Sequence, residues 1–229
     1  MARQISVISS MATRQILADL VGEYEQLTGC RVTIESVGGV DAARRVRGGE
    51  PFDVVVLAAT VMEQLEDAGR IVAGSRREFA RSAMAMAIRS DSPRPSVDDE
   101  QSVRQAVLGA RNIGCSTGPS GGHLMQLLER WGIRGSISPR IVQAPPGVPV
   151  GVLLARGEAD LGFQQLSELL DLPGIEVIGV LPPEIQAITV FSAGVCSASS
   201  QPGEAGALIA YLTSPDAQAA KRRHGMEAI

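Results

Sequence analysis

The chain has 229 residues, of which 45% are hydrophobic and 20% charged, and its formal net charge is −4. This balance is typical of a globular protein with a substantial core and excludes a wholly disordered chain. The sequence contains no basic block, and aromatic residues make up only 3% of it, so we expect no nucleic-acid partner and no aromatic platform for stacking sugars or bases.

Three widely spaced cysteines, Cys30, Cys115 and Cys196, predict neither a disulfide framework nor a metal site. No P-loop, G-x-G-x-x-G, H-E-x-x-H or G-x-S-x-G motif is present, and no cofactor is expected. No apolar run approaches the roughly 18 residues of a membrane helix, so the protein is not expected to be embedded in a membrane. A strand is predicted almost at Met1, which leaves no room for a secretory signal; we expect a cytoplasmic protein, or a periplasmic one if a signal has been removed.

The first 80 residues predict successive strand–helix units. The expected strands are Gln4–Ser9, Arg31–Ser36 and Asp53–Leu57, and the expected helices begin after Ser9, at Asp41 and at about Thr60. The stretch Val37-Gly38-Gly39-Val40 is predicted to be a tight turn before the second helix. Such βα units favour a right-handed, mostly parallel sheet.

A second run of strand–helix units follows the long strand Phe79–Ile88 and a loop rich in proline and serine. Its expected helices are Val97–Leu108, His123–Trp131, Val150–Ala155 and Gln164–Leu170, and its expected strands are Asn112–Cys115, Arg140–Gln143 and Asp160–Phe163. Another long apolar segment, Ala187–Ser197, precedes two closing helices, Gly203–Leu212 and Pro215–His224.

A helix, a glycine, an acidic residue and an apolar strand follow one another twice, at residues 42–56 and 150–163. This repeat predicts two similar α/β lobes, the first formed by residues 1–80 plus 198–229 and the second by residues 90–186. The strands at about 79–89 and 187–197 are then expected to be antiparallel crossovers that form a hinge. Ligands of such folds bind at the carboxyl ends of strands, so we expect a cleft that closes around a ligand.

Three predicted strand-to-helix loops are rich in serine, threonine and glycine. Helix N-termini expose unpaired N–H groups, so these loops favour an anion, although any one of them can also be an ordinary helix cap. The ligand-binding residues expected from these loops are Ser9, Ser10, Gly38, Gly39, Val40, Ser116, Thr117, Ser120 and Gly121.

Charged side chains near these loops are further candidates. Arg14 is predicted one turn into its helix, where its guanidinium could bind a carboxylate, and Arg44 and Arg45, one turn beyond the second loop, could do the same. The alternative is a solvated helix face, which is favoured for Arg44 and Arg47. His123 is either an acid/base group or an ordinary polar residue at a helix start. Asp53 and Asp160 begin parallel strands at the opposite edge, so we interpret both as structural.

These pieces, in this order, resemble the type II solute-binding proteins of ABC importers, and most closely the molybdate-binding branch. The resemblance rests on Ile8-Ser9-Ser10, Gly49-Glu50-Pro51-Phe52-Asp53-Val54 and Gly157-Glu158-Ala159-Asp160-Leu161-Gly162, and it extends over almost the whole chain. It implies a two-lobed α/β fold, each lobe a mostly parallel sheet flanked by helices. It also implies a small anionic ligand and a transporter permease as a partner.

The chain departs from the molybdate-binding pattern in ways that favour a carboxylate ligand. Gly39 stands where the family has a serine, Phe163-Gln164-Gln165 replaces an expected tyrosine, and Glu168 replaces an aspartate. Arg14 adds a cation to a site that is largely neutral in molybdate binders. With an arginine fork and two glutamine amides as contacts, a di- or tricarboxylate fits better than molybdate.

Residues 9–14, 36–41 and 162–168 are also similar to an aconitate isomerase branch of the family. Such an enzyme moves a double bond within a tricarboxylate by a 1,3-proton shift, which requires one group that takes and returns a proton. His123 is the first candidate for this group, and Asp41 or Glu168 is the next. Two functions therefore remain open. The absence of an unambiguous acid/base pair favours the substrate-binding component of an importer; the alternative is a cofactor-free isomerase of trans- and cis-aconitate.

Overall fold

The computed structural model describes residues 4–229, which divide into two α/β units. The first unit comprises the chain up to Ser82 together with Val190–Ile229, and the second comprises Ala83–Thr189. The chain enters the second unit in β4 (Arg77–Arg89) and returns in β9 (Ile188–Val195). Both boundaries fall inside these strands, so part of each strand belongs to the first unit and part to the second.

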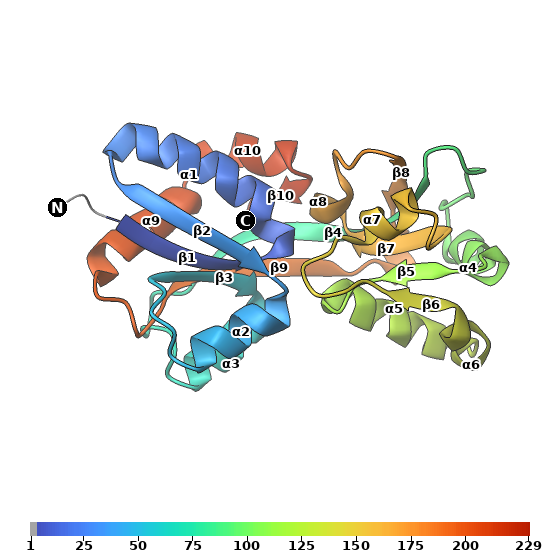
Figure 1. Cartoon of the computed structure of the whole chain (residues 1–229), viewed down its shortest axis with the longest axis horizontal. Helices are drawn as coiled ribbons and strands as arrows, with labels where there is room; N and C mark the ends of the chain where they lie inside the picture. The colour runs from blue at the N-terminus through green and yellow to red at the C-terminus, as the bar shows by residue number, and fades with distance from the viewer. Residues whose placement is uncertain (1–3) are drawn as a thin grey trace. The chain divides into compact units, whose positions relative to one another are not determined.

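The first unit is a sheet in the order β2-β1-β3-β9 with helices on both faces (Figure 1). β1 (Gln4–Ser10) is parallel to β2 (Arg31–Val37) and β3 (Val54–Ala58), and β9 is antiparallel to β3. One face carries α1 (Arg14–Thr28), α9 (Pro202–Leu212) and α10 (Gln218–Arg223), and the other carries α2 (Gly39–Arg47) and α3 (Ala59–Asp67). The short strand β10 (Met226–Glu227) pairs with the start of β4.

The second unit repeats this plan in the order β6-β5-β7-β4-β8. β5 (Ile113–Cys115) is parallel to β6 (Ile141–Gln143) and β7 (Leu161–Gln165), and β4 is antiparallel to β7 and to β8 (Ile175–Val180). One face carries α4 (Glu100–Gly109), α5 (Pro119–Arg130) and the short α6 (Arg134–Ile137), and the other carries α7 (Val150–Ala155) and α8 (Leu166–Leu169).

The buried strands supply both hydrophobic layers of each unit because successive side chains point to opposite faces of a sheet. In β3, Val54 and Val56 pack toward α1, whereas Val55 and Leu57 pack toward α2 and α3. This explains why these strands read as continuous apolar runs in the sequence. The mixed α/β architecture predicted from the alternation of strands and helices is confirmed.

Several element boundaries differ from the prediction. α2 begins at Gly39 rather than Asp41. α5 begins at Pro119 rather than His123, because proline is favoured at the first helical position, where its missing N–H would have no partner anyway. α4 begins only at Glu100, behind a capping box formed by Asp99 and Ser102. β7 extends to Gln165, and β8 was not predicted. As a result, Gly39, Val40, Ser120 and Gly121 lie in first helical turns, and Gln164 and Gln165 lie on a strand.

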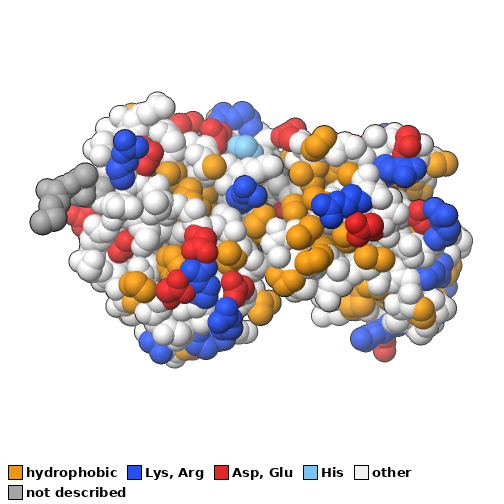
Figure 2. All heavy atoms as spheres, viewed as in Figure 1, with side chains coloured by type: hydrophobic (Ala, Val, Ile, Leu, Met, Phe, Trp, Pro, Cys, Tyr) orange, Lys and Arg blue, Asp and Glu red, His pale blue; other side chains and the backbone are white. Residues whose placement is uncertain are grey.

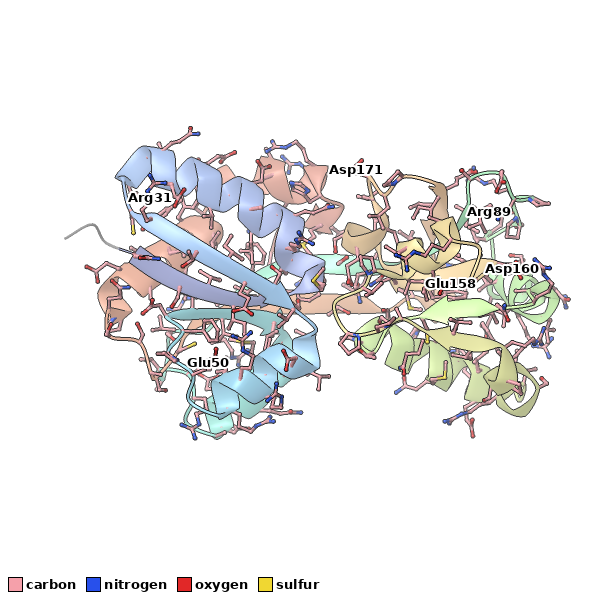
Figure 3. All side chains as sticks on the ribbon, viewed as in Figure 1. Arg31, Glu50, Arg89, Glu158, Asp160 and Asp171 are labelled. Carbon is pink, nitrogen blue, oxygen red and sulfur yellow. The ribbon has the colours of Figure 1, made fainter. Side chains whose placement is uncertain are left out.

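The carboxylates of Asp53 and Asp160 accept hydrogen bonds from neighbouring segments near the N-terminal ends of the strands. This agrees with the structural role expected of both residues. Asp53 accepts hydrogen bonds from the main-chain N–H and the hydroxyl of Ser6, each at 2.9 Å. Asp160 accepts from the N–H groups of Arg111 and Asn112 at 3.0 and 3.2 Å, and its label in Figure 3 marks this end of the second sheet. The acidic residue of the repeated phrase thus accepts main-chain hydrogen bonds in both units, from within β1 in the first unit and from the residues just before β5 in the second.

Candidate functional site

The carboxyl ends of β1 and β2 bring together the first group of candidate residues. We call Ser9, Ser10, Arg14, Gly38, Gly39 and Val40 the first-unit donor set. The strand register pairs Ser9 with Ser36 and Ser10 with Val37, so the loop after β1 lies beside the start of α2. A Cβ placed on Gly39 would lie 3.8 Å from the Cβ of Ser10. A residue from each of two loops predicted to bind an anion is therefore in close contact within one unit.

The two serines of this set differ in what their hydroxyls do. Ser9 is fully buried, and its Oγ lies 2.8 Å from the Oγ of Ser36, so it ties β1 to β2. Ser10 is only 9% exposed, and its hydroxyl has no hydrogen-bond partner among residues 4–229. A buried hydroxyl without a partner costs free energy unless a ligand or water supplies one. Ser10 is the hydroxyl of this set that is free to bind a ligand.

The start of α2 offers main-chain donors next to Ser10. Gly38 precedes the helix, and no side chain within the described range caps it. The first hydrogen bond across this turn runs from the N–H of Ala42 to the carbonyl of Gly38 at 2.9 Å, so the N–H groups of Gly39 and Val40 lie ahead of it. Unpaired N–H groups of this kind, at the positive end of a helix, suit an oxyanion. The side chain of Val40 is 71% exposed and adds an apolar rim.

Of the three arginines predicted to reach a carboxylate, only Arg14 is free. Arg14 is the first residue of α1, is exposed and makes no hydrogen bond or ion pair with any of residues 4–229. Arg45 donates to Glu50 at 2.7 Å and to Glu35 at 2.9 Å. Arg44 pairs with Asp41 on the surface. Glu50 is labelled in Figure 3. Because the guanidinium of Arg45 is hydrogen-bonded to this carboxylate, it is not free to bind the carboxylate of a ligand.

Several other arginines are also paired with acidic side chains, among them Arg76 with Glu66, Arg94 with Glu176 and Arg111 with Asp160. On the face drawn in Figure 2, blue and red side chains are interleaved and form no continuous basic block. Among residues 4–229 no group of three or more histidine, cysteine, aspartate or glutamate residues could hold a metal ion. In the same range, no helix is both long and apolar enough to cross a membrane.

The carboxyl ends of β5 and β7 bring together the second group, which we call the second-unit donor set: Ser116, Thr117, Ser120, Gly121, His123, Gln164, Gln165 and Glu168. Cys115 and Phe163 are paired in register, so Ser116 and Gln164 are the next residues along two adjacent strands. The Oγ of Ser116 lies 3.0 Å from the Oγ of Ser120 and accepts a hydrogen bond from the N–H of Gly118 at 3.2 Å. Thr117 is exposed.

Gly121 is required for α5 to begin where it does. A Cβ at this position would lie 1.9 Å from the carbonyl oxygen of Ser116, which is main chain and cannot move aside. Gly122, the next residue of the same helix, has nothing within 4 Å of such a Cβ. The first turn of α5 therefore packs directly on the end of β5, and this contact keeps Ser116 and Ser120 together.

Gln164 has a fixed orientation, although amide oxygen and nitrogen atoms are often interchangeable. It is 2% exposed, and its Oε1 lies 2.7 Å from the main-chain nitrogen of Val150, the first residue of α7. Since a main-chain N–H can only donate, this atom of Gln164 must be the oxygen. Its Nε2 consequently donates to Oε1 of Glu168 at 2.7 Å.

Glu168 supplies the carboxyl group of the second-unit donor set, and the pKa of this group is shifted. Burial raises its pKa to about 7, although the hydrogen bond from Gln164 acts in the opposite direction. A carboxyl group that titrates near neutral pH can both take up and return a proton at working pH. One of its oxygens is held by Gln164, which leaves the other for proton transfer.

His123 and Gln165 have partners that the sequence did not reveal. Nε2 of His123 lies 2.8 Å from the carbonyl oxygen of Ile185, so Nε2 carries the proton and Nδ1 is the nitrogen left for proton transfer. Gln165 is 1% exposed; its Nε2 lies 2.6 Å from Oγ1 of Thr189, while its Oε1 has no partner among the described residues. Thr189 belongs to no sequence motif and was not predicted to be near the site.

Substituting the two neighbouring glycines of α5 tests the packing of its first turn. Gly121→Ala should destabilise the protein by about 2 kcal/mol or more, because the added methyl group overlaps main chain. Gly122→Ala, the matched control on the same helix, should stabilise it by about 0.5–1 kcal/mol. Urea unfolding of both variants measures these effects. Equal stability of the two variants would contradict the close contact at Ser116.

Glu168→Gln tests the raised pKa without any ligand. In the unfolded chain a glutamate titrates near 4.5, whereas Glu168 in the folded protein titrates near 7, so the wild type loses stability as pH rises through this interval. The glutamine variant does not ionise and should be more stable than the wild type at pH 8 by up to about 3 kcal/mol, but not at pH 4. Glu158→Gln, at an exposed residue, is the control. A gain that is equal at both pH values would contradict the assignment.

Comparison with known proteins places the chain in a family. It matches the bacterial extracellular solute-binding proteins over residues 5–227. It is 33% identical to the aconitate isomerase of a Pseudomonas species, over 98% of this chain and 88% of that protein. It is 28% identical to the molybdate-binding protein ModA of Azotobacter vinelandii, over 91% of this chain and 84% of that protein.

The solved structures agree at the level of the fold. The periplasmic molybdate-binding protein of Azotobacter vinelandii superposes with a TM-score of 0.83 at 23% identity, over 98% of this chain and 99% of that one. The fold expected from the sequence resemblance is thereby confirmed. The chain belongs to the bacterial extracellular solute-binding protein family, within the ModA-like type II group that includes an aconitate isomerase branch.

Proposed function

We propose that the protein binds a small unsaturated polycarboxylate, such as aconitate, and moves its double bond by a 1,3-proton shift. The observation that carries the proposal is Glu168, a carboxyl group with a pKa of about 7 whose orientation is set by a buried amide. The 33% identity to an aconitate isomerase over nearly the whole chain supports this chemistry.

The reaction needs a single group that takes and returns one proton. The ionised carboxylate of Glu168 removes a proton from the methylene carbon next to the double bond, and the electron pair of the broken C–H bond forms the new double bond. The electrons of the old double bond then take the proton back from Glu168 at the far carbon. No other atom is gained or lost, and no redox partner is needed.

The charge that develops during this shift spreads onto the carboxylate oxygens of the ligand. Fixed donors stabilise such charge best because they need no reorganisation during the reaction. Among the described residues, the second unit, which contains Glu168, holds the hydroxyls of Ser116 and Ser120; one of them donates to the other, and the second O–H is left to donate to a ligand carboxylate. In the first unit, the hydroxyl of Ser10 and the guanidinium of Arg14 have no partner among residues 4–229. Donors of this kind suit carboxylate groups.

A second candidate function is the substrate-binding component of an ABC importer. Membership of the solute-binding family favours it, and so do Ser10 and Arg14, two donors of the first unit without a partner among residues 4–229, because a binding protein needs donors but no acid/base group. This role would require a periplasmic protein and a permease partner. The isomerase has no such requirement, and it also accounts for the raised pKa of Glu168, which an importer component does not need.

Arg14→Ala tests whether the ligand is a carboxylate. A hydrogen bond from a guanidinium to a carboxylate contributes about 1.5–3 kcal/mol, so the affinity for trans-aconitate should fall at least tenfold. Arg31→Ala is the control, because it removes the same charge at the start of β2, the end of that strand away from Arg14 (Figure 3). It should leave the affinity unchanged. Isothermal titration with trans-aconitate and with molybdate measures both. An Arg14→Ala variant with wild-type affinity for trans-aconitate removes Arg14 from the site.

Glu168→Gln tests the isomerase directly. The variant should bind trans-aconitate within a fewfold of the wild type but form no detectable cis-aconitate in a proton NMR time course, because glutamine cannot exchange a proton with the ligand. In the wild type, kcat should rise with pH and level off above about 7. Glu158→Gln should retain full turnover.

Three outcomes separate the candidates. Turnover by the wild type that Glu168→Gln abolishes supports the isomerase. Turnover that survives in this variant shifts the proton transfer to another group, and Nδ1 of His123 is then next to be tested. Binding of trans-aconitate by a wild type that never converts it leaves the importer component as the function.

A further inference from the structure

The amide of Gln165 is held at one end and unpaired at the other. Gln165 ends β7, and its Nε2 lies 2.6 Å from Oγ1 of Thr189 on β9. The remaining end, Oε1, is buried and has no hydrogen-bond partner among residues 4–229. Gln164, the preceding residue, points to the opposite face of the sheet and uses both ends of its amide. Of these two adjacent buried glutamines, Gln164 therefore has both amide ends hydrogen-bonded, whereas Gln165 has only one.

The unpaired amide oxygen of Gln165 destabilises the ligand-free protein unless a ligand supplies a hydrogen-bond partner. Leaving a buried polar group without a partner costs about 1–3 kcal/mol. The residue is 1% exposed, so bulk solvent does not hydrate the amide freely. Gln165 also lies two residues beyond Phe163, where the parallel pairing of β7 with β5 ends, and thus at the edge of the sheet where ligands of α/β folds bind. The free end of Gln165 is thus placed to bind a polar group of a ligand.

The bond to Thr189 determines what that free end can be. A hydroxyl donates or accepts equally well, so the amide of Gln165 can rotate by half a turn and keep its bond to Thr189. In one orientation Thr189 accepts from Nε2 and the free end is an oxygen, which suits a ligand hydroxyl. In the other orientation Thr189 donates to Oε1 and the free end is an NH₂ group, which suits a carboxylate.

We propose that Thr189 is a positioning residue that lets Gln165 turn its amide nitrogen toward a ligand carboxylate. This inference rests on the proposed carboxylate ligand and adds the residue that orients one of its contacts. Binding then replaces the unpaired oxygen by a hydrogen bond from Thr189 and pairs the released N–H with the ligand. Neither atom of the amide is left without a partner in the bound protein.

Two substitutions at Thr189 separate its hydroxyl from its shape. Thr189→Val keeps the branched side chain but removes the hydroxyl, so the amide loses its anchor and the affinity for trans-aconitate should fall about tenfold. Thr189→Ser keeps the hydroxyl and should bind within about twofold of the wild type. Thr33→Val, the same change at an exposed position of β2, is the matched control and should have no effect.

The effect must also depend on Gln165. In a Gln165→Leu background there is no amide to orient, so Thr189→Val should cause no further loss of affinity, and the two changes should be far from additive. The readout is isothermal titration with trans-aconitate, and circular dichroism establishes that each variant is folded.

The results distinguish this inference from the proposed function. A wild type that binds no trans-aconitate contradicts both. A wild type that binds it, together with a Thr189→Val variant of unchanged affinity, contradicts only the role of Thr189. Additive losses from Gln165→Leu and Thr189→Val also contradict it, because each residue would then act independently of the other.

Discussion

The hydrogen bond from the main-chain N–H of Val150 to the side-chain oxygen of Gln164 organises the chemistry of the second unit. It occupies the first N–H of α7, so the N-terminus of that helix is bound by the protein itself. It also fixes which end of the amide faces Glu168, and thereby holds one carboxylate oxygen and leaves the other free. The raised pKa of Glu168 then gives this held carboxyl group a protonation state that changes near neutral pH. One main-chain contact therefore connects the fold to the proposed proton transfer.

The two edges of each sheet satisfy their polar groups differently. At the starting ends of the strands, Asp53 and Asp160 have hydrogen bonds from neighbouring main-chain N–H groups, and each ties two segments together. At the carboxyl ends, Ser10 and Gln165 each keep a buried polar atom without a partner, and Glu168 is a half-buried carboxyl group. Each of these three features costs stability in the ligand-free protein. A protein retains such costs where they serve binding or catalysis. In each unit these groups lie at the carboxyl-end edge of that unit's own sheet, the edge at which ligands of α/β folds bind.

The sequence predicted the features that depend on local pattern. Alternating apolar strands and amphipathic helices gave the α/β architecture, and the repeated acidic residue before a strand identified Asp53 and Asp160 as structural. Features that depend on distant partners were not predictable. Arg45 looks like a free cation in the sequence, but its guanidinium is hydrogen-bonded to the carboxylate of Glu35, which lies ten residues earlier on β2. Val150, which orients the amide of Gln164, is 14 residues away from it, and Thr189 is 24 residues away from Gln165. Neither the orientation of Glu168 nor the contact with Thr189 therefore has a sequence signature.

The central claim is that Glu168 changes its protonation state near neutral pH, and a carbon-13 NMR titration of its side-chain carboxyl group measures this directly. In protein labelled at glutamate, the resonance absent from Glu168→Gln identifies the residue. The account predicts a midpoint near pH 7 for this resonance, and a higher midpoint in Gln164→Leu, because the bond from Gln164 lowers the pKa. A midpoint near 4.5, the ordinary value for glutamate, would contradict the account.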